Sequence, residues 1–310
     1  MTTITSQPKR AIRPLGVIWR GLVVGVGYVV LTVGAGMLDN LLGIKIDITN
    51  LPMDYTQILT GSAVAGVVIG LTLGPLSTRL HTRLIDRTVA LFVAIFMVMT
   101  FLSTVEAVFF TTFVTTANFA ALPMQAVTEA LLALLVAWLF PPVSVTETLP
   151  QAIRATLAER SAFSWAWRFV VAGVLYVPIY LFFGMLVAPI VVPYYTALDL
   201  PLVIPSFSVM IPVEVVRGLL FAASLFPLIA LLRGSRWRMA FWLGLTIAAL
   251  GGWAPLLAGS FLPTTLRIVH GVEITADSFV QGLMLAWLLG VGVWRTRTAS
   301  KPLRHAGKAA

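Results

Sequence analysis

Long apolar segments constrain this chain more than any other feature of its sequence. Each is close to the roughly 20 residues that an α-helix needs to cross the hydrocarbon core of a bilayer. Apolar residues make up 59% of the chain and charged residues only 11%, whereas soluble domains have about 25% charged residues. We therefore expect an all-α integral membrane protein with about eight transmembrane helices. The expected spans are residues 16–38, 57–78, 88–113, 122–140, 163–188, 207–232, 238–262 and 274–294.

The basic residues predict how these helices are oriented. Of the 21 basic residues, 18 lie in the terminal tails or on the side of the membrane that the chain reaches after every second span. The exceptions are Lys45, Arg217 and Arg267. This asymmetry is typical of cytoplasmic loops. It predicts a multi-pass protein of the cytoplasmic (inner) membrane with both termini in the cytoplasm. The net charge of +9 is then explained by topology, so we expect anionic lipid at the cytoplasmic face as a partner rather than nucleic acid.

Several cofactor classes lack the residues that they require. The chain has no cysteine, which excludes disulfides and thiolate metal sites. No lysine lies within an expected span, so a retinal Schiff base has no attachment point. No Walker motif is present, and no two histidines lie within the bilayer to hold a haem between them. The sequence therefore predicts neither a cofactor nor a metal.

The chain contains an internal duplication. Residues 19–38 and 167–186 are identical at ten of twenty positions at a constant offset of 148, where apolar composition alone would give roughly two. A second match, Pro75 with Pro227, has an offset of 152, and a third, Trp138 with Trp287, has an offset of 149. Four spans in each half place both halves in the same orientation. We therefore expect two parallel four-helix repeats related by a pseudo-two-fold axis along the membrane normal.

The duplication divides the chain into five parts. Between the repeats, the spacing of Leu149, Ile153 and Leu157 predicts a short amphipathic helix on the cytoplasmic surface. On the other side, four prolines in the loop 188–206 favour an extended segment over a helix. The expected parts are a basic tail (1–15), a first repeat (16–140), a linker (141–162), a second repeat (163–294) and a second basic tail (295–310).

Ionisable and amide side chains within the spans are the candidate binding residues, because such groups are costly in a bilayer. Several pairs are three or four residues apart and so share a helix face. The topology places all of them in the outer half of the membrane. The candidates are Glu106, Gln125, Glu129, Glu214, Arg217, His270, Glu273, Asp277 and Gln281. Whether Gln125 and Glu129 correspond to Asp277 and Gln281, at an offset of 152, or are displaced by one turn, at 149, stays open.

Three functions are compatible with this pattern. The first is a transporter or permease with a polar cavity between the repeats; four carboxylates (Glu106, Glu129, Glu214 and Asp277) beside one arginine (Arg217) would suit a cation, an amine or proton coupling. The second is a structural or assembly subunit, in which these groups form separate structural hydrogen bonds and the chain binds another membrane protein or a second copy of itself. The third is an intramembrane enzyme acting on a lipid or a peptide.

Overall fold

The computed structural model describes residues 14–43, 55–112, 114, 116–196, 202–259 and 262–291. Within these ranges the chain is helical, apart from turns and one isolated bridge between Thr111 and Leu202. Seven of the described helices are long and apolar enough to cross a membrane, so this is a polytopic membrane protein.

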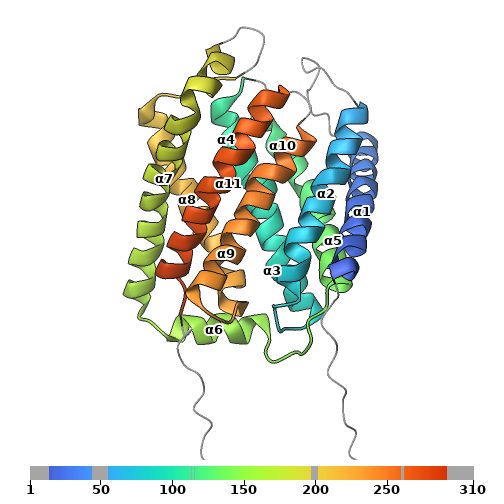
Figure 1. Ribbon diagram of the computed structural model, residues 1–310, viewed down its shortest axis with the longest axis vertical. Coiled ribbons are helices and arrows are strands. Elements are labelled where there is room, and N and C mark those ends of the chain that lie inside the picture. The colour runs from blue at the N-terminus through green and yellow to red at the C-terminus, as the bar shows by residue number, and fades with distance from the viewer. Residues whose placement is uncertain are drawn as a thin grey trace, which may run out of the picture.

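The helices of the first half form one side of the bundle, beside those of the second half (Figure 1). In the first half, α3 and α4 are joined without a break by the π-helical segment η1, and in the second half η3 joins α9 and α10 in the same way. The first half contains α1 (Pro14–Leu41), α2 (Tyr55–Ser77), α3 (Leu84–Ala94), η1 (Ile95–Phe101), α4 (Leu102–Phe110), η2 (Thr116–Ala121) and α5 (Leu122–Leu139). After α6 (Leu149–Ala158), the second half contains α7 (Ala162–Thr196), α8 (Phe207–Leu231), α9 (Arg236–Ile247), η3 (Ala248–Trp253), α10 (Ala254–Ala258) and α11 (Thr264–Leu288).

The last helix, α11, differs from its predicted span. It begins at Thr264 rather than at residue 274 and ends at Leu288 rather than at residue 294. It runs along the bundle in contact with α7 and α9 (Figure 1), although it is not among the seven apolar helices. Hydropathy does not mark its first turns because they carry Arg267, His270 and Glu273, and the last two of these face the interior of the bundle.

The prediction of an extended segment after residue 188 was wrong for its first part. The helix α7 continues through Pro189 and Pro193 to Thr196. Proline fixes a φ angle that a helix accepts, and each one removes only one backbone donor. Membrane helices tolerate this loss because neighbouring groups can satisfy the freed carbonyls. Proline density alone therefore did not predict where this helix ends.

Glycines allow the first two helices of each half to cross closely. A Cβ on Gly66 would lie 2.8 Å from the Cα of Gly25 on α1, and one on Gly218 would lie 3.0 Å from the Cα of Gly173 on α7. The neighbouring tyrosines also correspond, because the same added atoms would lie 2.7 Å from Cβ of Tyr28 and 2.6 Å from Cβ of Tyr176. The two crossings thus use residues that match at the two sequence offsets, 148 and 152. Small residues are common where membrane helices approach closely.

The two π-helical segments also occupy matching places. Each interrupts the third long helix of its half, and the two segments contact each other: a Cβ on Gly251 of η3 would lie 3.5 Å from Cγ1 of Val98 on η1. π-Helical turns inside α-helices frequently lie at functional sites. The contact between η1 and η3 therefore directs attention to the space beside it.

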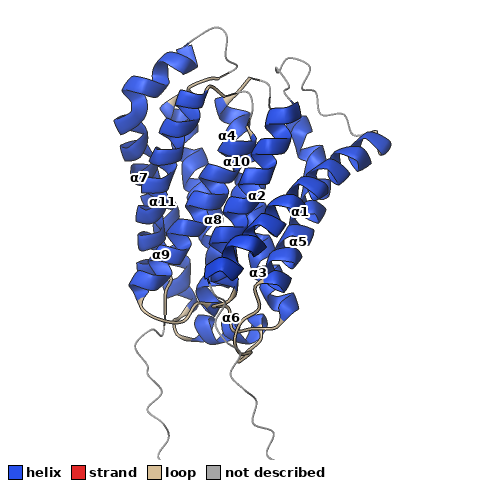
Figure 2. Cartoon of the chain, turned by 45° about the vertical axis from the view of Figure 1, so that its right-hand side comes forward, coloured by secondary structure: helices blue, strands red, loops and turns tan. Residues whose placement is uncertain are grey.

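One end of the bundle is covered by α6 (Figures 1 and 2). Thr148 caps this helix by accepting a hydrogen bond from the backbone N–H of Gln151, and the Gln151 side chain accepts one from Thr148 in return. The buried face of α6 consists of Leu149, Ala152 and Thr156 and packs towards α8 and α3. The helix begins at the expected residue, but Leu157, which we expected on its apolar face, is 42% exposed.

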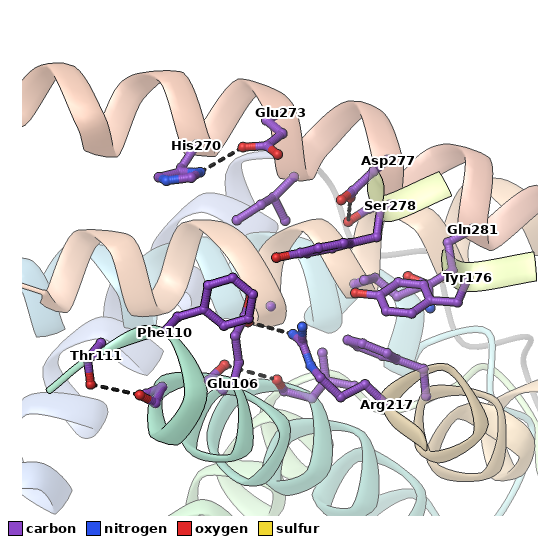
Figure 3. A pocket seen from close by; sticks show the side chains of 18 of the residues that line it. Glu106, Phe110, Thr111, Tyr176, Arg217, His270, Glu273, Asp277, Ser278 and Gln281 are labelled. Atoms are coloured by element: carbon purple, nitrogen blue, oxygen red, sulfur yellow. Dashed lines mark hydrogen bonds and ion pairs between the residues drawn. The ribbon is translucent and has the colours of Figure 1, made fainter. Parts of the chain in front are cut away.

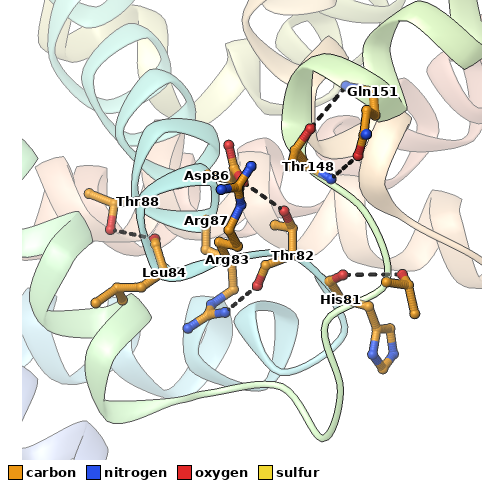
Figure 4. Close-up of polar contacts among 10 residues, drawn as sticks. His81, Thr82, Arg83, Leu84, Asp86, Arg87, Thr88, Thr148 and Gln151 are labelled. Atoms are coloured by element: carbon orange, nitrogen blue, oxygen red, sulfur yellow. Dashed lines mark hydrogen bonds and ion pairs between the residues drawn. The ribbon is translucent and has the colours of Figure 1, made fainter.

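Hydrogen bonds fasten the linker to the loop between α2 and α3 (Figure 4). The backbone N–H of Thr146 donates to the carbonyl of His81 at 2.8 Å. Arg87, buried at the start of α3, donates to the carbonyls of Thr82 at 2.6 Å and Ala137 at 3.1 Å. These contacts fix the ends of α2, α3 and α5 together, which makes the α6 end of the bundle a rigid base.

Candidate functional site

A polar cavity of about 220 Å³ lies between α4, α7, α8 and α11. Both π-helical segments contribute to its wall, through Val98 of η1 and Gly251 of η3. Thr111, Tyr195 and Leu262 also line the cavity. These three residues lie where their segments are farthest from α6. The cavity is therefore enclosed by elements of both halves. It extends from the end of the bundle away from α6 to the middle, because Tyr176, Phe221 and Gln281 lie halfway along their helices or beyond.

One face of α11 supplies most of the polar wall (Figure 3). His270, Glu273, Asp277 and Gln281 follow one another in steps of three and four residues, which places them on one side of a helix. His270 Nδ1 lies 2.7 Å from Oε2 of Glu273, and the Ser278 hydroxyl donates to Oδ1 of Asp277 at 3.3 Å. Asp277 is only 8% exposed, so its carboxyl group meets the cavity rather than the surrounding membrane.

Opposite α11, Arg217 of α8 binds two carboxylates, and Figure 3 shows the one from Glu106. Its Nη1 donates to both oxygens of Glu214 at 2.8 Å, and its Nη2 donates to Oε2 of Glu106 at 2.5 Å. Glu214 is fully buried, one turn away on the same helix, while Glu106 comes from α4 and its side chain is 35% exposed. The guanidinium group thus joins the first half to the second across the cavity wall.

Aromatic side chains form much of the remaining wall. Tyr176 and Tyr180 are one turn apart on α7, and Tyr195 lies at the end of the same helix. The Tyr176 ring is 5.3 Å from Phe221, and the Tyr180 ring is 6.4 Å from Phe110. These tyrosines were not among the predicted site residues. The available signal was the spacing of Tyr176 and Tyr180, together with the match of Tyr176 to Tyr28 in the duplication.

Gln281 is a buried polar group without a protein partner. The residue is 1% exposed and lines the cavity, yet its amide nitrogen has no hydrogen-bond partner among the described residues. An unsatisfied buried donor costs about 1–3 kcal/mol. A cavity wall that keeps such a donor is suited to a ligand that offers an acceptor.

The structure brings together most of the predicted site residues. Glu214 lies behind the wall, bonded to Arg217, and Gln125 and Glu129 on α5 do not line the cavity. Glu129 is 3% exposed and accepts a hydrogen bond from Thr100 on η1. The six predicted residues that line the cavity are Glu106, Arg217, His270, Glu273, Asp277 and Gln281.

The first-half positions aligned with Glu214 and Arg217 carry no charge. An offset of 152 aligns Ser62 with Glu214 and Ala65 with Arg217. There, α2 and α10 pack closely, and a Cβ on Gly61 would lie 2.1 Å from the carbonyl oxygen of Leu257. Small residues thus close one crossing of the halves, whereas large charged residues line the other. The cavity lies where the second half carries charged residues that the aligned first-half positions lack.

The described residues offer no metal cluster, since no group of three or more His, Asp or Glu side chains is arranged to hold an ion. The cavity serines are not paired with the histidine either: Ser278 bonds to Asp277 and Ser103 to the carbonyl of Val98, while His270 bonds to Glu273. Among the described residues, the histidine of the cavity is therefore not positioned as the base of a cavity serine.

No protein-family model matches the sequence, and no curated protein or solved structure is significantly similar to it.

Proposed function

We propose that this protein is a transporter or permease whose solute binds in the cavity between α4, α7, α8 and α11. The observation that carries the proposal is the convergence of polar groups from both halves on a single cavity, with the Gln281 amide nitrogen left unsatisfied there. If these polar groups formed only separate structural hydrogen bonds, we would not expect them to line one cavity together. Binding sites near the interface of two repeats are common among transporters.

We further propose that eight helices cross the membrane as two parallel four-helix repeats. The matched glycine crossings of α1 with α2 and of α7 with α8 support this arrangement, as do the matched positions of η1 and η3. In this arrangement α11 is the eighth span. Its polar residues are compatible with a membrane because they face the cavity.

The charge distribution supports an orientation with α6 in the cytoplasm of a cell whose inner membrane holds the protein. Arginines near α6 carry most of the positive charge of the described residues, as cytoplasmic loops do. Anionic lipid would then lie against this end, and the cavity would extend from the outer side to the middle of the bilayer. The expectation that all candidate residues lie in the outer half was wrong for Gln281, because α11 begins at Thr264 and Gln281 lies past its middle. The arginines that support this orientation are Arg79, Arg83, Arg154, Arg160, Arg168, Arg233, Arg236 and Arg238.

A structural or assembly subunit is the second candidate. An apolar groove of about 610 Å³ lies between α1 and α5, at the edge of the bundle (Figure 2). Its walls include Gly27, Val30 and Trp138, and Val30 and Trp138 are each more than 60% exposed. Such a groove would accept a helix of a partner membrane protein or of a second copy. Lipid chains would fill it equally well.

The absence of cysteine from the natural chain makes a direct test of transport possible. A Ser278→Cys variant places one thiol in the cavity with almost no change of volume. If the cavity opens alternately to both sides, membrane-impermeant thiol reagents label this variant from either side of a proteoliposome. A static subunit allows labelling from one side at most.

Two control variants report the side of the membrane. Ser206 and Ser161 are exposed at opposite ends of the bundle. The Ser206→Cys variant should react only from the cavity side, and the Ser161→Cys variant only from the α6 side. Labelling of the Ser278→Cys variant from the Ser206 side alone, or from neither side, would contradict the transporter proposal.

A further inference from the structure

The cavity contains more acidic groups than basic ones. The carboxyl groups of Glu106, Glu273 and Asp277 line it, and Glu214 lies directly behind. The basic groups are Arg217 and His270. Even with both of these protonated, the fully ionised cluster would carry a formal excess of two negative charges.

Arg217 is already occupied by its own partners. Both oxygens of Glu214 and one oxygen of Glu106 accept from its two terminal nitrogens. Among the described residues, Asp277 accepts a hydrogen bond from the Ser278 hydroxyl, and Glu273 bonds to His270. No arginine or lysine among the described residues forms an ion pair with either carboxylate of α11. The carboxyl groups without an arginine or lysine partner therefore lie on the α11 side of the cavity.

The remaining walls also favour a positively charged ligand. The rings of Tyr176, Tyr180, Tyr195, Phe110 and Phe221 line the cavity, and aromatic faces attract cations. The volume of about 220 Å³ corresponds to roughly seven water-sized groups. A drug-sized ligand would need more space, and a bare metal ion would find no ligand cluster among the described residues.

We infer that the solute is a small organic cation with N–H donors, bound between the carboxylates of Asp277 and Glu273 and the tyrosines of α7, with an acceptor directed at Gln281. The inference rests on the proposed transport function and adds the substrate class. An anion would meet an arginine that is already paired and carboxylates on both sides, so like-charge repulsion would exclude it.

Charged thiol reagents of similar size test the sign of the cavity. The Ser278→Cys variant is labelled with a thiosulfonate carrying trimethylammonium and with one carrying sulfonate, each rate being normalised to the exposed Ser206→Cys variant. We expect the cationic reagent to react at least about tenfold faster. Equal rates, or a faster anionic reagent, would overturn the cation assignment. The comparison of the two reagents needs labelling from one side only. It can therefore contradict the cation assignment while labelling from both sides still supports transport. Conversely, labelling from both sides can fail while the cation assignment holds.

Protection from labelling tests the ligand class directly. Ethylammonium should slow the labelling of the Ser278→Cys variant, while propionate, an anion of similar size, should not. Protection by propionate alone would indicate an anion site. Protection by neither would also count against an organic cation with N–H donors.

A charge-removing variant tests the role of α11. Asp277→Asn, combined with Ser278→Cys, should lower the ratio of cationic to anionic rates about tenfold and weaken the protection by ethylammonium. Glu129→Gln removes an equally buried carboxylate outside the cavity and should leave the ratio unchanged. If Asp277→Asn does not fold, Glu273→Gln provides the same comparison. An unchanged ratio in whichever cavity variant folds would overturn the inference.

Discussion

Arg217 depends on its two carboxylate partners, and they depend on it. Arg217 is 5% exposed and Glu214 is fully buried, so contact with bulk water stabilises neither charge. Breaking a buried ion pair by removing one partner leaves an uncompensated charge and is strongly destabilising. The same pair near a surface would contribute little. The location of Arg217, more than its contacts, determines its importance for stability.

We predict that Arg217→Gln lowers the free energy of unfolding by about 3–5 kcal/mol. The double variant Arg217→Gln with Glu214→Gln should recover at least about 1 kcal/mol of that loss, because it leaves no buried charge on α8. Thermal unfolding of the purified protein in detergent measures both. Arg83→Gln is the matched control: Arg83 pairs with Asp86 at 3.5 Å, its side chain is 64% exposed, and its loss should cost less than about 1 kcal/mol. A similar loss for Arg83→Gln and Arg217→Gln would contradict this account.

The sequence predicted the polar residues but not how they group. Spacing along α11 was sufficient to place His270, Glu273, Asp277 and Gln281 on one face. Position within the membrane plane depends on which helices are neighbours, and spacing within one helix carries no such information. For this reason Glu129 could not be separated from Asp277, although it bonds to Thr100 away from the cavity. The tyrosines of α7 were missed because aromatic residues in an apolar helix are ordinary.

At the scale of the elements, close packing of α1 and α2 rests on the absence of side chains. Gly21 and Gly25 on α1 lie against Gly70 and Gly66 on α2. A Cβ added to Gly66 would lie 2.8 Å from the Cα of Gly25, and one added to Gly70 would lie 2.8 Å from the Cα of Gly21. Backbone atoms cannot move aside as a flexible side chain can. The two helices would therefore have to separate to accept even a methyl group.

Gly66→Ala should lower the free energy of unfolding by about 1–3 kcal/mol, because the added methyl group would overlap α1. Gly34→Ala on α1 is the control, since nothing lies within 4 Å of an added Cβ there and alanine favours a helix more than glycine does. Thermal unfolding should therefore show a loss for Gly66→Ala and none for Gly34→Ala. Equal stability of the two variants would contradict this prediction, because it would mean that α1 and α2 can accept the added methyl group without loss of packing.

Helix ends and irregular turns were the least predictable features of the elements. Proline spacing suggested that a helix ends near residue 188, but α7 continues past Pro189 and Pro193. No residue pattern in this sequence predicted the π-helical segments η1 and η3. Their matching positions became visible only when the duplication could be compared with the structure.

At the scale of the whole molecule, the number of membrane crossings determines where the chain ends. An even number returns the chain to its starting side. The start of α1 and the end of α11 both lie at the α6 end of the bundle, which follows if α11 crosses fully. With only the seven strongly apolar helices crossing, the two ends would lie on opposite sides.

We predict that affinity tags attached before residue 1 and after residue 310 are cleaved by a protease from the same side of a proteoliposome. That side should be the one from which the Ser161→Cys variant is labelled, with the Ser206→Cys variant as the opposite marker. Cleavage of the two tags from opposite sides would show that α11 does not span the membrane.

The uneven charge of the two crossings has a consequence for how such a protein could arise. Two separate copies of one four-helix unit, paired about a symmetry axis, would present every side chain twice, and would hold either two equivalent cavities or none. Within a single chain, each half is free to vary alone. One crossing, at Gly61 and Leu257, stays closed and holds the halves together, while the other is open to selection for a ligand. If the chain arose by duplication, as we propose, joining the copies would separate the residues that hold the molecule together from those that bind a ligand, a division that a symmetric pair could not make.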